Sequence, residues 1–235
     1  MNIGIITINY KRPAVLALWC AQINRLREDL QMYVPAVVVS EAVDAPICNK
    51  YHVVHIEQQN NPATEKWNRA MKYMQRQGAT NVMIMGSDDV ISTDSFKRIM
   101  AEAEKGYDLI GSSDLYFFAL DGIYRGGMVR LHTHRGKMLA PGKTVSSYVL
   151  DKIDWRPWTT PKNWGMDAIA DKNFNLHVRA RTVLHSMDIF DLKSRENLNK
   201  STLWFEKIKE REDPAKLWSI LGEEETCLLK KILCL

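Results

Sequence analysis

Short apolar runs alternate with stretches of helical periodicity along the first half of the chain. The apolar runs are bounded by turn-forming residues, and several are rich in β-branched residues, as buried strands are. They lie at residues 3–8, 34–40, 53–56 and 81–85. Apolar positions recur at helical spacing in the stretches around them, at residues 13–30, 64–77 and 93–105. This alternation predicts an α/β fold with a mostly parallel central sheet that is flanked by helices.

The pattern changes after residue 120. Strand-like sequence at residues 107–120 is followed by turn pairs such as Asp121-Gly122, which favour hairpins and loops. We expect two more regular elements there, a helix and then a strand, at residues 166–172 and 178–184. From Ser194 the chain is polar, charged and prone to form helices. It therefore predicts a helical C-terminal tail.

The composition is that of an ordinary globular protein, with 46% hydrophobic and 26% charged residues. The formal net charge of +4 favours an anionic ligand, but no block of five like charges occurs, so a nucleic acid is permitted and not indicated. Four cysteines without a Cys-x-x-Cys pair favour a reduced compartment over a disulfide framework or a zinc site. The N-terminus resembles a strand more than an export signal, and no apolar run reaches about 18 residues. We expect a cytoplasmic protein without an integral membrane segment.

Two adjacent carboxylates follow the strand at residues 81–85. This strand leads into Gly86-Ser87-Asp88-Asp89, and in open α/β sheets ligands bind at the carboxyl ends of the strands. Paired acids at that place suit a divalent cation, and a phosphate-bearing ligand would follow. The alternative is that Asp88 and Asp89 only cap the helix that begins near Thr93.

Three other motifs for nucleotides or metals are incomplete. No Gly-x-Gly-x-x-Gly follows the first strand, which argues against a dinucleotide-binding fold. Gly142-Lys143-Thr144 lacks the glycine that a phosphate loop requires five positions earlier, where Lys137 stands. His132 and His134 have no further partners in the sequence pattern, so they are more simply interpreted as polar surface residues than as metal ligands.

Four segments share the order and spacing of the elements of a known family. They are Thr7-Ile8-Asn9-Tyr10-Lys11-Arg12-Pro13, Asn61-Pro62, Lys66-Trp67-Asn68-Arg69-Ala70 and the strand that ends in Gly86-Ser87-Asp88-Asp89. These segments resemble a glycosyltransferase of the GT-A fold, similar to the family 2 type, over about residues 1–120. The resemblance implies a GT-A-like (Rossmann-like) domain in which residues 1–120 bind a nucleotide sugar and residues 121–190 face the acceptor. Residues 191–235 would form a helical extension.

The resemblance also implies roles for individual residues. In that family an Asp-x-Asp motif holds a Mn²⁺ or Mg²⁺ ion that bridges the diphosphate; here Ser87 replaces the first acid, so the metal contact would fall chiefly on Asp89. His185 follows the last predicted strand, where some members place a further metal ligand. Asp167 resembles the catalytic base, although Met166 replaces the second acid of the usual pair, and the alternative is that Asp167 only stabilises a helix N-terminus. The expected contacts to the nucleotide sugar are Thr7, Asn9, Lys11, Arg12, Glu41, Asn61, Lys66, Asn68, Ser87 and Asp88.

Together these features predict transfer of a sugar from a nucleoside diphosphate sugar to an acceptor hydroxyl, with metal assistance and inversion. Two alternatives stay open: a non-catalytic nucleotide- or sugar-binding module, and a nucleotidyltransferase on a related fold. The acceptor is not defined, since a glycan, a protein, a lipid or a modified DNA base can be served by one scaffold. Trp155, Trp158 and Trp164 form either an acceptor platform or part of the core.

Overall fold

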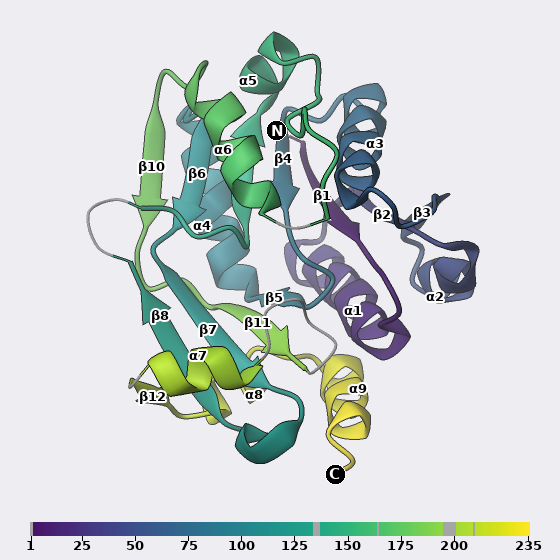
Figure 1. The fold of residues 1–235 in the computed structure, drawn as a ribbon, viewed down its shortest axis with the longest axis vertical. Coiled ribbons are helices and arrows are strands. Elements are labelled where there is room, and N and C mark those ends of the chain that lie inside the picture. The colour runs from purple at the N-terminus through teal and green to yellow at the C-terminus, as the bar shows by residue number, and fades with distance from the viewer. Residues whose placement is uncertain (1, 134–136, 164, 195–200, 209) are drawn as a thin grey trace.

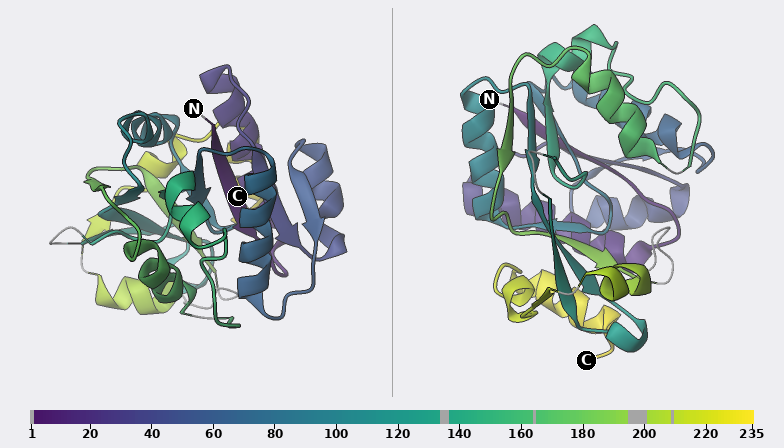
Figure 2. Two further views of the ribbon diagram at one scale, coloured as in Figure 1. Left: turned by 90° about the horizontal axis from the view of Figure 1, so that it is seen from above. Right: turned by 60° about the vertical axis from the view of Figure 1, so that its left-hand side comes forward.

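The computed structural model describes residues 2–133, 137–163, 165–194, 201–208 and 210–235. These residues form two sheets, which lie one above the other in Figure 1, with helices around both. The helices near the C-terminus gather at the end of the molecule opposite the helices of residues 147–175 (Figures 1 and 2).

Seven strands form the larger sheet: β1 Ile3–Ile8, β2 Ala36–Ser40, β3 Val54–Glu57, β4 Asn81–Ile84, β6 Leu109–Ser112, β9 Lys143–Ser146 and β10 Arg181–Leu184. Their order is β10-β6-β9-β4-β1-β2-β3. All neighbours pair in parallel except β9, which runs antiparallel between β4 and β6. β1 and β2 are almost completely buried apolar runs, as strands covered by helices on both faces must be.

Helices cover both faces of the larger sheet. One face packs against α3 (Ala63–Arg76), α5 (Ser147–Lys152) and α6 (Met166–Asn175). The other face packs against α1 (Pro13–Leu30), α2 (Ala45–Lys50) and α4 (Thr93–Glu104). β1 and β4 are inner strands of the sheet and lie between these two layers of helices. The carboxyl end of β4 therefore lies in the middle of the molecule (Figure 1).

Five strands form the smaller sheet: β5 Asp89–Ile91, β7 Asp114–Ala119, β8 Met128–His132, β11 Ile189–Lys193 and β12 Arg211–Glu212. Their order is β12-β8-β7-β11-β5. The remaining elements are η1 Ala42–Asp44, η2 Gly122–Tyr124, α7 Ser201–Lys207, α8 Ala215–Trp218 and α9 Glu223–Ile232. The chain passes directly from the larger sheet into this one three times, from β4 to β5, from β6 to β7 and from β10 to β11. The two sheets therefore share the junction at which the paired acids stand.

The structure corrects several sequence expectations. β9 and β11 lie in segments for which no strand was predicted, and the strand expected at residues 178–184 is limited to residues 181–184. The expected boundary between residues 190 and 191 falls inside β11. The helix-cap alternative for the paired acids is wrong, because the Ser92 hydroxyl accepts the Ser95 amide hydrogen bond (3.1 Å) and caps α4.

Two further observations concern the surroundings of the protein. None of the helices in the described parts of the chain has the length and apolarity to cross a membrane. The four cysteines, all within the described ranges, carry free thiols. Cys20 and Cys48 are buried, and Cys227 and Cys234 are exposed on α9 and just beyond it.

Candidate active site

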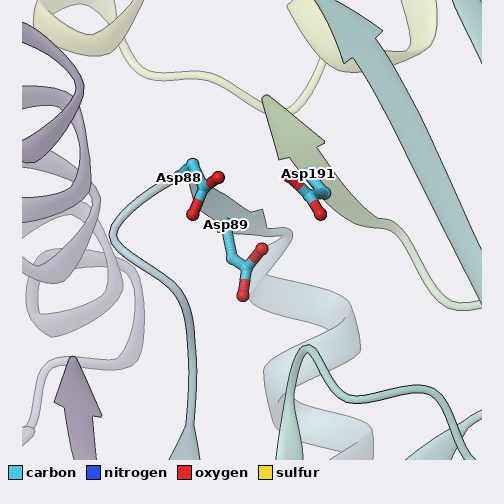
Figure 3. Close-up of side chains that lie close together, drawn as sticks. All are labelled: Asp88, Asp89 and Asp191. Atoms are coloured by element: carbon cyan, nitrogen blue, oxygen red, sulfur yellow. The ribbon is translucent and has the colours of Figure 1, made fainter. Parts of the chain in front are cut away.

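Three buried acids meet where the two sheets join. Asp88 and Asp89 follow β4, and Asp191 lies on β11 directly opposite Asp89 in an antiparallel pair. One carboxylate oxygen from each acid lies within 4.8 Å of the others. Figure 3 shows Asp191 approaching the two adjacent acids from the neighbouring strand. The site is thus assembled from segments about one hundred residues apart in sequence.

Gly86 allows the chain to turn tightly beneath these acids. Its backbone N–H donates a hydrogen bond of 2.5 Å to Asp89 Oδ2. A Cβ at this position would lie 2.7 Å from Asp88 Oδ1 and 3.2 Å from Asp89 Oδ2. Only glycine therefore leaves room for both carboxylates in their present positions.

Two basic side chains balance part of the negative charge. Arg12 Nη1 donates to Asp88 Oδ2 over 2.8 Å, and Arg12 Nη2 donates to Ser87 Oγ over 2.9 Å. Lys193 Nζ lies 2.6 Å from Asp191 Oδ2. With three acids and two bases in one buried cluster, an excess of one negative charge results when all five groups are ionised.

This imbalance separates the three carboxyl pKa values. Burial disfavours the ionised form of Asp88, but Arg12 and Lys193 outweigh burial and lower the pKa of Asp88. Burial, together with the nearby Asp191 and Asp88, raises the pKa of Asp89 well above its ordinary value. Burial also raises the pKa of Asp191 to about 7, although Lys193 opposes the shift. Asp89 and Asp191 are therefore the acids that a further cation stabilises most in the ionised form.

The donor set fits a hard divalent cation. Within the described residues, Asp191 Oδ1 is buried and has no hydrogen-bond partner, which is unusual for a buried polar atom. Carboxylate oxygens are the ligands that Mg²⁺ and Mn²⁺ prefer. Asp88, Asp89 and Asp191 are thus the residues that could hold such an ion.

His185, which was expected to be a metal ligand, lies outside this group of acids. Its Nδ1 is 2.8 Å from Ser113 Oγ, at the corner between β6 and β7. Asp191 is the third member of the cluster instead. The acid that joins Asp88 and Asp89 therefore lies on β11, the strand that follows β10, and not at the position of His185.

Asp167 lines the same pocket as the three acids. This pocket has a volume of about 340 Å³, and its lining includes Trp67, Gly86 and Trp204 as well as the acids. Asp167 lies in the first turn of α6 with its side chain accessible from the pocket. The pocket walls displace part of its hydration, which raises the pKa of Asp167; Lys143 opposes this shift and Asp171 adds to it. A carboxylate that is both accessible and easier to protonate is suited to accept a proton.

Six of the residues expected to contact the nucleotide sugar, Asp88 among them, are buried and bonded within the protein. Lys66 Nζ donates to the carbonyl oxygen of Asn9 over 2.6 Å, and burial lowers the pKa of Lys66 to about 8. Ser87 Oγ donates to Asn9 Oδ1 over 3.0 Å, which links this network to Arg12. Asn68 donates to the carbonyl oxygen of Trp158, and Thr7 is fully buried within β1. These side chains position the loops around the site.

The other residues that were expected to contact the nucleotide sugar have more accessible side chains. Lys11 is exposed, with a positive φ of 55°, and Glu41 is half-buried just before η1. Asn61 is exposed and accepts a hydrogen bond of 3.2 Å from Asn163. Arg12 borders the 340 Å³ pocket through Asp88 and also lines, with Lys11, a separate pocket of about 500 Å³.

Three tryptophans were expected to form either an acceptor platform or part of the core, and the two that the structure describes belong to the core. Trp155 and Trp158 are buried, and Trp158 stacks on Trp67 with ring centroids 5.4 Å apart. Trp164 lies outside the described residues. Among the described residues, the aromatic side chains that line the pocket are Trp67 on α3, Trp204 on α7 and Phe117 on β7.

Asp191 and Lys193 are the site residues that sequence reasoning missed. Apolar and charged residues alternate only at the end of the segment Ile189-Phe190-Asp191-Leu192-Lys193. The tail beyond this segment was predicted to be helical, so no strand was expected here. A short strand carrying an acid and a lysine at alternate positions is a signal for charges on one face of a sheet. That signal was present in the sequence.

Comparisons with known proteins identify the fold. No family model matches the chain, and no curated protein matches its sequence. Among solved structures, residues 1–349 of S. aureus TarS match 99% of this chain and 69% of that chain, with a TM-score of 0.60 and 14% identity. A second S. aureus TarS structure matches 83% of this chain with a TM-score of 0.59 and 18% identity, and this chain covers 37% of its length.

Two structures of other enzymes share the same architecture. Mannosyl-3-phosphoglycerate synthase from Rubrobacter xylanophilus has a TM-score of 0.55 and 10% identity over 83% of this chain and 68% of its own. The 4-diphosphocytidyl-2C-methyl-D-erythritol synthase from Anaerococcus prevotii has a TM-score of 0.51 and 11% identity over 78% of this chain and 86% of its own. The GT-A-like α/β fold expected from the sequence is confirmed by these similarities.

Proposed function

We propose that this protein transfers a sugar from a nucleoside diphosphate sugar to an acceptor hydroxyl, with inversion at the anomeric carbon. One observation carries the proposal: Asp167 and the three acids Asp88, Asp89 and Asp191 line a single pocket at the carboxyl end of β4. The pocket offers carboxylates for a metal ion and a separate carboxylate for a proton.

The three clustered acids would hold Mg²⁺ or Mn²⁺, which supplies charge neutralisation for a diphosphate leaving group. Gly86 keeps the space for their carboxylates open. Arg12 fixes Asp88 and is joined through Ser87 to Asn9 and Lys66. We assign Lys11, Glu41 and Asn61 to direct contact with the nucleotide, because they are accessible and, unlike Arg12, are not bonded to the acid cluster.

Asp167 is assigned the role of general base. Its carboxylate takes the proton of the acceptor hydroxyl as the acceptor oxygen bonds to the anomeric carbon, while the bond from that carbon to the diphosphate oxygen breaks. The electron pair of the broken bond leaves with the nucleoside diphosphate. Attack from the side opposite the leaving group inverts the anomeric configuration.

The raised pKa of Asp167 makes it a better proton acceptor than an ordinary surface aspartate. Its location in the pocket also supports catalysis over the non-catalytic binding module, because a module that only binds its ligand needs no base beside the acids. The nucleotidyltransferase alternative predicts a different product and is tested separately. The acceptor stays a class, a molecule with a nucleophilic hydroxyl.

A turnover assay tests this proposal without knowledge of the acceptor, because water can replace it slowly. We would incubate the protein and Mn²⁺ with a panel of nucleoside diphosphate sugars and measure the released nucleoside diphosphate. Asp167→Asn should reduce turnover about 100-fold or more, the usual contribution of a general base, while leaving the affinity for the donor nearly unchanged.

Asp171→Asn is the matched control, since it removes a carboxylate one turn further along α6 that pairs with Lys143. It should keep turnover within a few-fold of the parent protein. Equal turnover in Asp167→Asn and the parent would contradict the assignment. Release of pyrophosphate from a nucleoside triphosphate would instead support nucleotidyl transfer.

A further inference from the structure

The lysine of β11, Lys193, lies among the acids of the pocket. Asp191 and Lys193 are alternate residues of this strand, so their side chains point to the same face of the smaller sheet. That face points towards the pocket, because both residues line it together with Phe117 of the neighbouring strand β7. Among the described residues that line this pocket, Lys193 is the one with a positive charge.

The ammonium group of Lys193 is held at the acid cluster and is only partly bonded. Its Nζ lies 2.6 Å from Asp191 Oδ2, and the lysine side chain is 9% exposed. Asp191 in turn has a carboxylate oxygen within 4.8 Å of oxygens of Asp88 and Asp89. An ammonium group carries three N–H donors, and within the described residues Asp191 is the acceptor that Lys193 reaches. Because buried polar groups are normally bonded, the remaining donors are available to a ligand.

An aromatic wall lies beside the same ammonium group. Lys193 Nζ is 5.6 Å from the ring centroid of Phe117, and this ring stacks on Trp204 with centroids 4.7 Å apart. Both aromatic residues line the pocket. The ammonium group is therefore largely shielded from solvent, and its attraction to an anion is stronger there than in water.

The charges of the cluster show what the lysine adds. Three acids face Arg12 and Lys193, which leaves an excess of one negative charge. A divalent cation on the acids would convert this into an excess of one positive charge, which attracts a diphosphate. Without the lysine, the cation would only neutralise the cluster. Arg12 does not replace the lysine, because its guanidinium group is bonded to Asp88 and Ser87 and is not part of the pocket lining.

We propose that Lys193 binds the diphosphate of the donor through its ammonium group, beside a metal ion held by the three acids. The inference rests on the proposed function and adds a residue to it: the lysine contacts the leaving group directly, whereas the acids act through the metal. An ammonium group forms charge-assisted hydrogen bonds with phosphate oxygens. These bonds hold the bound diphosphate and stabilise its charge when the bond to the sugar breaks.

Calorimetric titration of the full-length protein with UDP, GDP, CDP, TDP and ADP, at saturating Mn²⁺, tests this contact. For the nucleotide that the wild type binds, Lys193→Met should lower the affinity by about tenfold to hundredfold, the usual contribution of a hydrogen bond to a charged group. Lys193→Gln is a second neutral variant with the same expected loss, and circular dichroism verifies that each variant folds.

Lys216→Met is the matched control. Lys216 also pairs with an aspartate, since its Nζ lies 2.9 Å from Asp188 Oδ1, but it is not part of the pocket lining. The substitution therefore removes the same charge from a similar ion pair outside the pocket. It should leave the nucleotide affinity unchanged.

Titration with Mn²⁺ alone distinguishes a contact to the diphosphate from a role in positioning Asp191. For a contact, Lys193→Met should keep or raise the Mn²⁺ affinity, because it removes a positive charge beside the ion. A loss of Mn²⁺ affinity as large as the loss of nucleotide affinity would overturn the proposal. Nucleotide affinity equal to that of the wild type in a folded neutral variant would also overturn it and would leave the proposed function intact. Absence of nucleotide binding by the wild type would overturn both.

Discussion

Two pairs of buried acids in this protein differ in what surrounds them. Asp108 and Asp114 have a full set of hydrogen-bond donors. Hydrogen bonds from Arg179 lower the pKa of Asp108 to about 2. Burial alone would raise the pKa of Asp114, but hydrogen bonds from His132 and Arg130 outweigh it and lower that pKa.

Asp89 and Asp191 show the opposite behaviour. Burial and neighbouring carboxylates raise both pKa values, and Asp191 Oδ1 has no partner within the described residues. Acids of the first kind stabilise the fold, because each donor and acceptor is satisfied. Acids of the second kind are costly to keep ionised, and they are retained where a ligand supplies the positive charge that balances them. The contrast supports the proposal that the pocket acids are the functional ones.

The largest expected difference between the two pairs is in metal binding. Asp89→Asn and Asp191→Asn should each lower Mn²⁺ affinity by about 100-fold or more, since each removes a charged ligand and not only a supporting contact. Asp108→Asn should leave that affinity unchanged. Electron paramagnetic resonance of free Mn²⁺ measures the affinities, and equal losses in all three variants would mean that the contrast has no functional meaning.

The second difference is in stability, where we expect the larger loss from a substitution in the fully bonded pair and not in the pocket pair. Asp114→Asn should lower the free energy of unfolding by about 3 kcal/mol, because it leaves Arg130 and several donors without their partner. Asp89→Asn in metal-free protein at pH 8 should raise the free energy of unfolding or leave it unchanged, because it removes a carboxylate that is disfavoured in the ionised form. Urea unfolding curves measure both. A larger loss in Asp89→Asn than in Asp114→Asn would reverse the comparison.

The third difference is in pH dependence. The pKa of Asp191 rises from an ordinary 3.8 to about 7 in the folded state, so the folded state binds this proton more tightly than the unfolded state does. Its contribution to stability is therefore largest below about pH 4 and is lost as the pH rises towards 7. Asp108 has a lowered pKa of about 2, so its contribution is present above its ordinary pKa of 3.8 and is lost as the pH falls towards 2.

Metal-free protein should thus lose some stability between pH 5 and pH 8, and Asp191→Asn should reduce that loss. Mn²⁺ competes with the same protons, so its affinity should rise with pH, by about tenfold per unit for each proton released below the carboxyl pKa. The measurements are urea midpoints and Mn²⁺ titrations at the two pH values. Mn²⁺ affinity that is flat from pH 5 to pH 8 would be inconsistent with raised pKa values in the pocket.

The smallest expected effect comes from Gly86. Its Cβ in Gly86→Ala would lie 2.7 Å from Asp88 Oδ1, so the carboxylates must move. We expect a loss of about tenfold in Mn²⁺ affinity, comparable with the loss of a supporting contact. Gly78→Ala is the contrasting control: it has open space around its Cβ but a φ of +66°, so it should cost stability and leave Mn²⁺ affinity unchanged. The same Mn²⁺ titration distinguishes them.

The parts of the fold that sequence could predict are those encoded locally. The strand before Gly86 and the acids after it are continuous in sequence. The apolar run that ends in two acids therefore predicted on its own that these acids lie at the carboxyl end of a strand. Helix α3 was equally clear, because Trp67, Ala70, Met71 and Met74 recur on one face and are all buried.

The missed parts depend on contacts between distant segments. β9 is a short antiparallel strand between β4 and β6, and both of its pairing partners precede it by more than thirty residues in the sequence. Asp191 becomes part of the site only because β11 pairs with β5. The environment of Lys66 also depends on contacts between distant segments. This lysine was expected to contact the nucleotide, and in the folded protein its buried ammonium group donates a hydrogen bond to the carbonyl oxygen of Asn9.

The most direct test of the account is calorimetric titration of UDP, GDP, CDP, TDP and ADP with and without Mn²⁺. The proteins compared are the wild type, Asp89→Ala, Asp191→Ala and the control Asp171→Asn. We predict that one diphosphate binds, that its binding requires Mn²⁺, and that both cluster variants lose it while Asp171→Asn keeps it. Absence of binding by all five nucleotides, or binding that is the same in all four proteins, would contradict the assignment of this pocket to a nucleotide sugar.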